Sequence, residues 1–251
     1  STLVRTLKEL PEIEKVTLTT NGMLLKEQIQ ELAEAGIDNI NISLDTVDKA
    51  KFEKITRRKG LSKVLEGLEE ALKYPNIGLK INCVPVVEEP ENLVAVAKLA
   101  KEYPIHVRFI EMMPIGYGNI PQRISNEELK EKIMRYYGNL TEDFRIYGNG
   151  PAVYYSIEGF KGNIGFISAI HGKFCNLCNR IRMTSTGDIK PCLCYEQRWA
   201  LKPALRMEHK EKRQESIQKI LIESIKNKPQ MHCFENVKSV SEKHFMGQIG
   251  G

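Results

Sequence analysis

Apolar and polar positions in the first 120 residues follow two periods in turn. Short β-branched runs, such as KVTLTTNG at 15–22, are followed by segments whose apolar residues recur every three or four positions. One such stripe falls at i, i+3, i+4, i+7 and i+11 of a helix and consists of Leu61, Val64, Leu65, Leu68 and Leu72. The pattern predicts strands and helices in alternation.

The predicted elements succeed one another regularly. We expect strands at 15–22, 37–45, 77–87 and 105–116. The helices between them are expected at 24–36, 61–74 and 91–103. Four strands joined by helices imply a parallel sheet, either doubly wound or barrel-like. The predicted fold class is therefore α/β.

The rhythm of the sequence changes near residue 120. Residues 125–138 are typical of a helix with Ser125 as its N-cap. The stretch 144–175 is rich in glycine, tyrosine and isoleucine, and it predicts short antiparallel strands. We therefore expect two domains, formed by 1–120 and 121–251.

Polar side chains collect toward the carboxyl ends of the four predicted strands. They are Thr19, Thr20, Asn21, Ser43, Asp45, Lys80, Asn82, Arg108 and Glu111. In α/β barrels and open α/β sheets this edge carries the chemistry, although turn polarity alone explains any single one of these residues. Lys80 is harder to explain in that way, because an ammonium group inside an apolar strand needs an anion or a water-filled lumen.

Composition excludes several classes of protein. With 41% hydrophobic and 27% charged residues, the 251-residue chain has the composition of a globular protein. No apolar run approaches the roughly 18 residues of a membrane span, and STLVRTLKEL at 1–10 lacks the apolar region of a signal peptide. We therefore expect a cytoplasmic protein with no membrane partner. A net charge of +5 weakly favours an anionic partner, while a generic basic surface is the simpler explanation.

Four of the six cysteines fall within FCNLCNRIRMTSTGDIKPCLC at 174–194. Cys175 and Cys178 form a C-x2-C pair, thirteen residues separate Cys178 from Cys192, and Cys194 lies two positions further on. Six cysteines in a large intracellular chain favour metal binding or catalysis over disulfides. The spacing fits a four-thiolate zinc site and an iron–sulfur site about equally, and four unrelated buried cysteines are the remaining alternative.

Two arginines follow the first cysteine pair. Arg180 and Arg182 lie two and four residues past Cys178, so in an extended segment both side chains point to the same side. A closed zinc site has no need of this charge, whereas arginine offers a planar donor fork to phosphate or to a base edge. Unless they are ordinary surface residues, the arginines favour an iron–sulfur cluster that faces an anionic ligand.

Six segments of the chain together resemble a known family. They are LTTNG, INISLD, LKINCV, RFIEMMPIG, FCNLCNRIRMTSTGDIKPCL and the terminal IGG, and they span the chain from about residue 3 to its last residue. They are similar, in the same order, to the motifs of the molybdenum cofactor biosynthesis protein A family, the GTP 3′,8-cyclases of the radical S-adenosylmethionine superfamily. The resemblance implies an incomplete (β/α)6 barrel whose mouth is closed by a C-terminal domain. It also implies conversion of GTP to 3′,8-cyclo-7,8-dihydro-GTP by S-adenosylmethionine radical chemistry.

The resemblance implies roles for individual residues. The implied ligands of a C-terminal [4Fe–4S] cluster that anchors GTP are Cys175, Cys178 and Cys192, which leaves Cys194 as a spare. The implied GTP-binding residues are Thr19, Lys80, Arg108, Arg180, Ile181 and Arg182. The implied S-adenosylmethionine-binding residues are Ser43 and Met113. The terminal pair, implied to reach into the active-site pocket for catalysis, is Gly250 and Gly251.

The implied partners follow from the same family. They are GTP, an external electron donor and a downstream cyclic pyranopterin monophosphate synthase. No nucleic acid partner is expected, and a homodimer is left open. A second hypothesis, from another class, is a zinc-stapled basic module that binds nucleotide or nucleic acid without catalysis.

The sequence departs from the family pattern in its first part. Residues 1–82 contain no cysteine, so the C-x3-C-x2-C motif that holds the radical-initiating cluster is absent, and so is the Gly-Gly-Glu-Pro motif. Compared with the family, four of six barrel strands are present. We therefore expect an N-terminally truncated member that lacks the N-terminal [4Fe–4S] ligands and does not cleave S-adenosylmethionine by itself.

Overall fold

The computed structural model describes residues 1–86, 90–118, 124–172 and 174–249. The chain packs as two compact units, each of which is described by itself. The first comprises Ser1–Glu111 and Arg123–Ile167, and the second comprises Met112–Gln122 and Ser168–Gly251. No helix within the described ranges combines the length and the apolar character needed to cross a bilayer.

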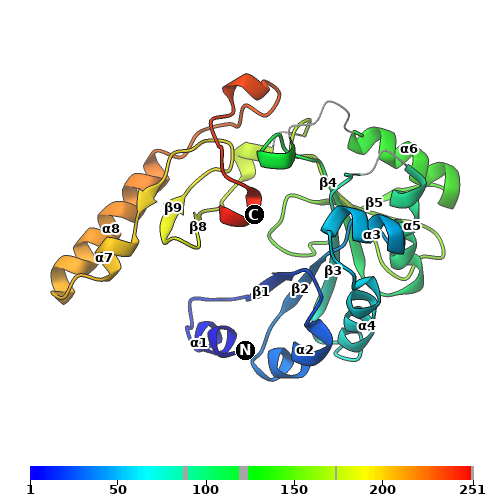
Figure 1. Ribbon diagram of the computed structural model, residues 1–251, viewed down its shortest axis with the longest axis horizontal. Helices are drawn as coiled ribbons and strands as arrows, with labels where there is room; N and C mark the ends of the chain where they lie inside the picture. Colours follow the sequence, from blue (N-terminus) through cyan, green and yellow to red (C-terminus); the bar gives the residue numbers. More distant parts are fainter. Residues whose placement is uncertain (87–89, 119–123, 173, 250–251) are drawn as a thin grey trace. The chain divides into compact units, whose positions relative to one another are not determined.

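A seven-stranded sheet forms the centre of the first unit (Figure 1). In spatial order its strands are β1 (Thr17–Thr20), β2 (Asn39–Ser43), β3 (Gly78–Cys83), β4 (His106–Ile110), β7 (Ile164–Ile167), β6 (Val153–Ser156) and β5 (Thr141–Asp143). The strands from β1 to β4 pair in parallel, as does β4 with β7. The β5 and β6 strands are antiparallel additions. The predicted parallel strands and the predicted antiparallel character after residue 144 are both confirmed.

The helices of the first unit follow the predicted order with two additions. They are α1 (Thr2–Lys8), α2 (Leu25–Glu34), α3 (Lys49–Thr56), α4 (Leu61–Ala71), α5 (Pro90–Glu102) and α6 (Asn126–Tyr137). Short α1 and α3 lie in segments without a long apolar stripe and were not predicted. Ser125 caps α6 as expected, because its Oγ accepts from the Glu128 backbone N–H and the Glu128 carboxylate accepts from the Ser125 N–H.

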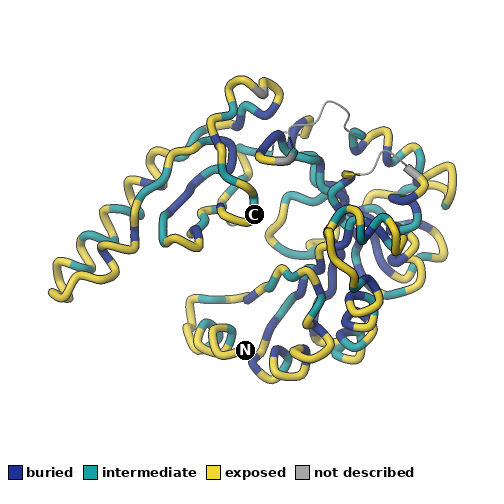
Figure 2. Tube along the Cα trace, in the orientation of Figure 1, coloured by how far each residue is buried: buried dark blue, intermediate teal, exposed yellow. Residues whose placement is uncertain are grey.

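The two faces of the sheet differ in polarity. On one face Ile40, Ile42, Ile81, Val107 and Phe109 are fully buried, and helices such as α2, α4 and α5 cover them (Figures 1 and 2). Most residues that alternate with these along β2, β3 and β4 are polar, and they line the opposite face. A parallel sheet normally has both faces covered, so this polar face indicates a binding surface.

The packing boundary differs from the predicted one near residue 120. Residues 123–167 pack with the first unit although they follow residue 120 in sequence. The reason is the parallel pairing of β7 with β4, which attaches β5, β6 and β7 to the first sheet. Sequence rhythm marked the change from βα units to antiparallel strands, but it carried no information on which sheet those strands join.

The second unit contains a small antiparallel sheet with the strand order β10, β9, β8. Its elements include β8 (Arg182–Met183), β9 (Asp188–Lys190), β10 (Trp199–Ala200), α7 (Lys202–Leu205) and α8 (Lys210–Lys226). Its described residues also include the short 3-10 turns η1 (Gly116–Gly118), η2 (Phe174–Leu177), η3 (Val237–Ser239) and η4 (Met246–Gln248). An apolar cluster joins its segments and contains Ile115, Ile170, Leu193, Cys194, Phe234 and Ile249.

Gly22 ends the TTNG turn after β1, and we expect its replacement by alanine to destabilise the first unit. Its φ is +76°, and an added Cβ would lie 2.9 Å from Val64 Cγ1. Left-handed strain and the steric overlap together should cost about 1–3 kcal/mol in the free energy of unfolding, measured by urea denaturation. Gly159 provides a matched control, because its φ is +77° but a Cβ there meets nothing within 4 Å. Equal destabilisation by both substitutions would contradict the steric part of this expectation.

Candidate functional site

The polar face of the first sheet gathers four of the predicted site residues. Strand pairing places Thr19 beside Asn41 and Asn41 beside Lys80, in one row across the sheet. The next row places Ser43 beside Asn82 and Asn82 beside Arg108. Since paired strands lie about 4.8 Å apart, side chains in these rows are close neighbours. The structure therefore brings Thr19, Ser43, Lys80 and Arg108 to one face of the sheet.

Two asparagine amides hold the Arg108 guanidinium. Arg108 Nη2 donates to Asn41 Oδ1 at 2.8 Å and to Asn82 Oδ1 at 2.6 Å, and its Nε donates to Asn82 Oδ1 at 2.9 Å. Asn41 Nδ2 in turn donates to Thr19 Oγ1 at 3.3 Å. Because these amides are neutral, they orient the guanidinium without cancelling its charge, which suits a group that binds an anion.

Lys80 is the buried cation of this face. Burial, together with the charges of Arg108 and Lys15, lowers the pKa of Lys80 to about 8. Its ammonium donates to the backbone carbonyl of Tyr147, in the loop between β5 and β6. Burial and the neighbouring Lys80 and Arg108 charges also lower the pKa of His106 to about 4. The mutual repulsion of these cations favours the binding of an anion here.

A β-hairpin explains the spacing of the cysteines in the second unit. The Cys178 N–H donates to the Cys175 carbonyl at 3.1 Å, which closes the C-x2-C turn. The chain then forms β8, turns at Gly187 with a φ of +87°, and returns as antiparallel β9. Cys192 follows β9 by two residues. The thirteen residues between Cys178 and Cys192 therefore contain this hairpin, and Cys192 lies just beyond its second strand.

The three thiols interact with one another and with backbone N–H groups. Burial raises the pKa of Cys192, and the nearby Cys175 and Cys178 raise it further. Burial by itself would raise the pKa of Cys178, but the Arg180 backbone N–H and the Lys228 ammonium hold it below its ordinary value. Cys178 therefore ionises more readily than Cys192, which favours its use as a ligand.

The donor set fits an iron–sulfur cluster. Thiolates are the ligands that select such clusters or zinc, and hydrogen bonds from backbone N–H groups to the sulfurs tune clusters. One such bond joins the His232 N–H to Cys175 Sγ at 3.3 Å. Within the described ranges, no three His, Cys, Asp or Glu side chains converge to hold a single metal ion. A cubane cluster takes each thiolate at a different iron, so its ligands do not need to meet at one point.

Arg180 and Arg182 lie on the same side of their segment. Both are half-buried, while Ile181 and Met183 between and beyond them are 42% and 59% exposed. Burial and the charge of Arg180 lower the pKa of Arg182, and the thiols of Cys178 and Cys192 oppose this effect. Arg182 therefore lies within electrostatic reach of two of the three thiols.

Two residues near the thiols were missed by sequence reasoning. Lys228 Nζ donates to the Arg180 carbonyl at 3.0 Å and approaches Cys178 Sγ at 3.6 Å. Cys233 lies next to Cys194, with their sulfurs 3.1 Å apart. Burial, together with the hydrogen bond and charge of Cys233, raises the pKa of Cys194 to about 12. No periodicity or motif in the sequence indicated either contact.

The two residues predicted to bind S-adenosylmethionine lie in different units. Ser43 is exposed at the end of β2, on the polar face of the first unit, whereas Met113 packs against the apolar cluster of the second unit. Gly250 and Gly251 lie outside the described residues. Ile249, directly before them, is 1% exposed within that apolar cluster.

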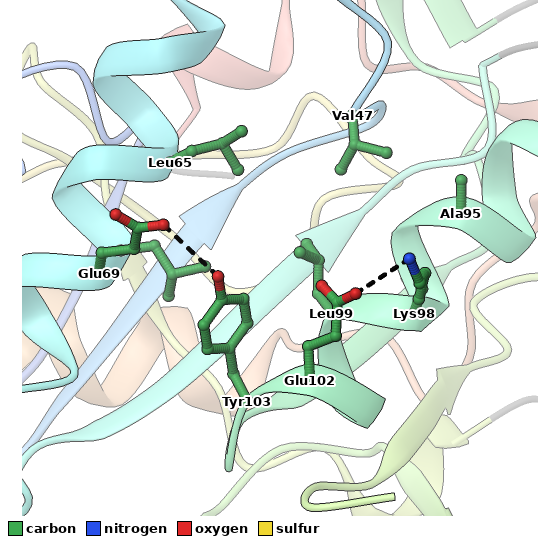
Figure 3. Close-up of a pocket in the computed structure, with 9 residues that line it drawn as sticks. Val47, Leu65, Glu69, Ala95, Lys98, Leu99, Glu102 and Tyr103 are labelled. Atoms are coloured by element: carbon green, nitrogen blue, oxygen red, sulfur yellow. Dashed lines mark hydrogen bonds and ion pairs between the residues drawn. The ribbon is translucent and has the colours of Figure 1, made fainter.

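An open pocket of about 340 Å³ lies elsewhere in the first unit, between α4 and α5 (Figure 3). Its lining includes Leu65 and Leu99, and its polar groups already interact with each other. Tyr103 Oη donates to Glu69 at 3.5 Å, and Lys98 pairs with Glu102 at 3.0 Å. None of the predicted site residues lines this pocket. It is a gap between two helices on the covered face of the sheet.

Comparison with known proteins gives matches over the whole chain. Residues 2–100 match the radical SAM superfamily and residues 105–234 match the Molybdenum Cofactor Synthesis C family. A GTP 3′,8-cyclase of Clostridium perfringens is 41% identical over 99% of this chain and 76% of its own length. Those of Syntrophomonas wolfei and Moorella thermoacetica are 39% and 36% identical, over 99% and 100% of this chain and 76% of their own lengths. The chain therefore belongs to the family of the GTP 3′,8-cyclases.

Proposed function

We propose that this protein acts in molybdenum cofactor biosynthesis as a GTP 3′,8-cyclase, a lyase that converts GTP to 3′,8-cyclo-7,8-dihydro-GTP by S-adenosylmethionine radical chemistry. The observation that carries the proposal is the grouping of Cys175, Cys178 and Cys192 around one hairpin, with Arg182 within reach of two of their sulfurs. Membership of the family supplies the reaction.

In the second unit, the three thiols would hold a [4Fe–4S] cluster. When bound, this cluster supplies an iron with an open coordination position for a purine nitrogen or oxygen. Arg180 and Arg182 then face an anionic or acceptor-rich ligand with two donor forks, and exposed Ile181 offers an apolar contact beside them. The C-terminal residues 121–251 would form the functional domain that anchors GTP.

In the first unit, the polar sheet face would bind anionic groups of a substrate. Lys80 and Arg108 would hold phosphate oxygens, and Thr19 would extend this polar row. We assign Ser43 and Met113 to the binding of S-adenosylmethionine. The terminal Gly250 and Gly251 are assigned a catalytic role in the active-site pocket. A parallel sheet with one polar face resembles the inner wall of a barrel, so we assign residues 1–120 to a partial (β/α) barrel. The proposed partners are an external electron donor and the downstream cyclic pyranopterin monophosphate synthase.

Metal analysis combined with nucleotide binding tests the proposal. After anaerobic reconstitution, we expect about four irons and about four sulfides per chain, and binding of GTP in preference to ATP. Tight binding should be lost when both Arg180 and Arg182 are replaced by Met, because a donor fork is removed at each position. About one zinc without sulfide would instead support the zinc-stapled binding module.

The polypeptide of residues 1–251, assayed by itself, is expected to form no 5′-deoxyadenosine from S-adenosylmethionine. The physical reason is the lack of any C-x3-C-x2-C triplet among these residues, since the radical-generating cluster needs three such thiolates. Chromatography of a reaction with dithionite and S-adenosylmethionine provides the measurement. Stoichiometric 5′-deoxyadenosine from the purified 251-residue chain would defeat this expectation.

The affinity for GTP is expected to fall as the pH rises through about 8. Phosphate favours the ammonium form of Lys80, whose pKa of about 8 means that the free protein loses this proton at higher pH. The affinity falls by up to tenfold per pH unit in the range between the pKa of Lys80 in the free protein and its higher pKa in the complex. Titration calorimetry between about pH 7 and about pH 9 measures it. A Lys80→Arg variant keeps its charge over this range and should show a flat profile. A flat profile in the unmodified protein would rule out a role for the Lys80 charge.

A further inference from the structure

Cys194 and Cys233 form a close pair of thiols that the proposed reaction does not use. Their sulfurs are 3.1 Å apart although 39 positions separate them in sequence. The Cys233 N–H donates to Cys194 Sγ at 3.2 Å, and Cys233 Sγ donates to the Ser239 carbonyl at 3.1 Å. These hydrogen bonds to backbone groups hold the two sulfurs next to each other. A disulfide requires about 2.05 Å, so a shift of about 1 Å would connect them.

The two thiols differ in access. Cys194 is fully buried in the apolar cluster, whereas Cys233 is half-buried and has a side open to small reagents. Such a pair has a reactive member and a resolving member, as in proteins that respond to thiol oxidants. Cys83 is the contrasting case, because it is fully buried and its thiol donates to the carbonyl of Asp45, at 3.8 Å.

We propose that Cys194 and Cys233 are a site of reversible oxidative modification, at which a low-molecular-weight disulfide such as oxidised glutathione converts the two thiols to an intramolecular disulfide. The Cys233 thiolate attacks one sulfur of the small disulfide, and a first glutathione leaves as its thiolate. The Cys194 sulfur then attacks Cys233 Sγ and releases the second glutathione, while the two cysteine protons pass to the two leaving thiolates. The two cysteines are oxidised and the small disulfide is reduced.

The bond would join the segment after β9 to the segment after α8. Hydrogen bonds already run between these two segments, from the Glu196 N–H to Ser241 Oγ at 3.0 Å and from the Glu242 N–H to the Cys194 carbonyl at 3.3 Å. The disulfide would therefore lock an existing contact without rearranging it. One consequence rests on the proposed function: the disulfide would hold the segment that leads to the proposed catalytic residues Gly250 and Gly251. The disulfide itself does not depend on that function.

Peptide mapping of the full chain tests the site. The protein is reconstituted anaerobically with iron and sulfide, exposed to oxidised glutathione, alkylated and digested with trypsin. Pro191 and Pro229 protect the bonds after Lys190 and Lys228, so Cys194 lies in peptide 183–198 and Cys233 in peptide 227–238. We expect these two peptides to be crosslinked, with fragmentation placing the bond at Cys194, and dithiothreitol to separate them.

Three variants complete the experiment. The crosslink should vanish in Cys194→Ser and in Cys233→Ser, and it should persist in Cys83→Ser. Survival of the crosslink in Cys194→Ser would assign it to Cys192, in the same peptide, and would overturn the proposal. So would a stable glutathione adduct on Cys233 or a link to peptide 174–180, which carries Cys175 and Cys178. The disulfide is detected in the chain of unchanged sequence and without nucleotide. A failure of GTP binding therefore leaves this result unaffected.

Discussion

Replacing Cys178 with serine is expected to reduce bound iron from about four atoms per chain to nearly none after anaerobic reconstitution. Its thiol has a pKa held below the ordinary value by the Arg180 backbone N–H and by Lys228, against the opposing effect of burial. This sulfur is therefore prepared to ionise and bind iron, and a serine hydroxyl does not ionise under the same conditions. Iron and sulfide analysis, with the absorbance near 400 nm, measures the loss.

Cys194→Ser is the matched control for this prediction. Cys194 lies two residues from a proposed ligand, but its sulfur contacts Cys233 and its pKa is raised to about 12. The variant should therefore keep nearly the full iron content. If Cys194→Ser loses its metal as completely as Cys178→Ser does, four thiols share the site, and the interpretation of a cluster with an open iron fails.

Replacing Lys190 with methionine is expected to destabilise the second unit by about 3–5 kcal/mol. Lys190 and the Glu242 side chain are both 0% exposed and form an ion pair. Glu242 also accepts from the His244 N–H at 2.7 Å, and the Lys190 ammonium donates to the Tyr195 carbonyl. Removal of the ammonium leaves a buried carboxylate without its cation, and this accounts for most of the cost. Urea denaturation followed by the fluorescence of Trp199, in the same unit, measures the change.

Two further variants separate this effect from a general loss of lysine. Lys190→Met combined with Glu242→Leu should regain much of the lost stability, because no unpaired charge remains buried. Lys26→Met removes an exposed pair with Glu66 at 2.9 Å and should change stability very little. A Lys190→Met variant as stable as Lys26→Met would show that the buried pair contributes nothing.

The repeated strands and helices of the first unit could be predicted because each has a local signature. The stripe from Leu61 to Leu72 identifies α4, and the alternation around Asn41 identifies β2. The close spacing of Cys175 and Cys178 also has a direct structural cause, a single turn. In these cases the residues that determine the structure are neighbours in sequence.

The unpredicted parts depend on contacts between distant segments. Lys228 reaches Cys178 across 50 positions, and the Tyr147 carbonyl reaches Lys80 across 67. The pairing of β7 with β4 likewise joins segments separated by an intervening helix and two antiparallel strands. No period or spacing encodes such contacts. Lys228 and Cys233 also lie outside the motif segments that resemble the family.

The contact between Lys80 and Tyr147 has a consequence for how binding strength changes as sequences diverge. The acceptor is a main-chain oxygen, so any amino acid at position 147 presents the same group. Point substitutions that preserve the path of the loop would leave the lysine tethered, whereas a deletion or insertion within 144–152 would displace the oxygen and free the ammonium. Among relatives, the length of this loop is therefore a better guide than its residues to how much charge is available to an incoming nucleotide.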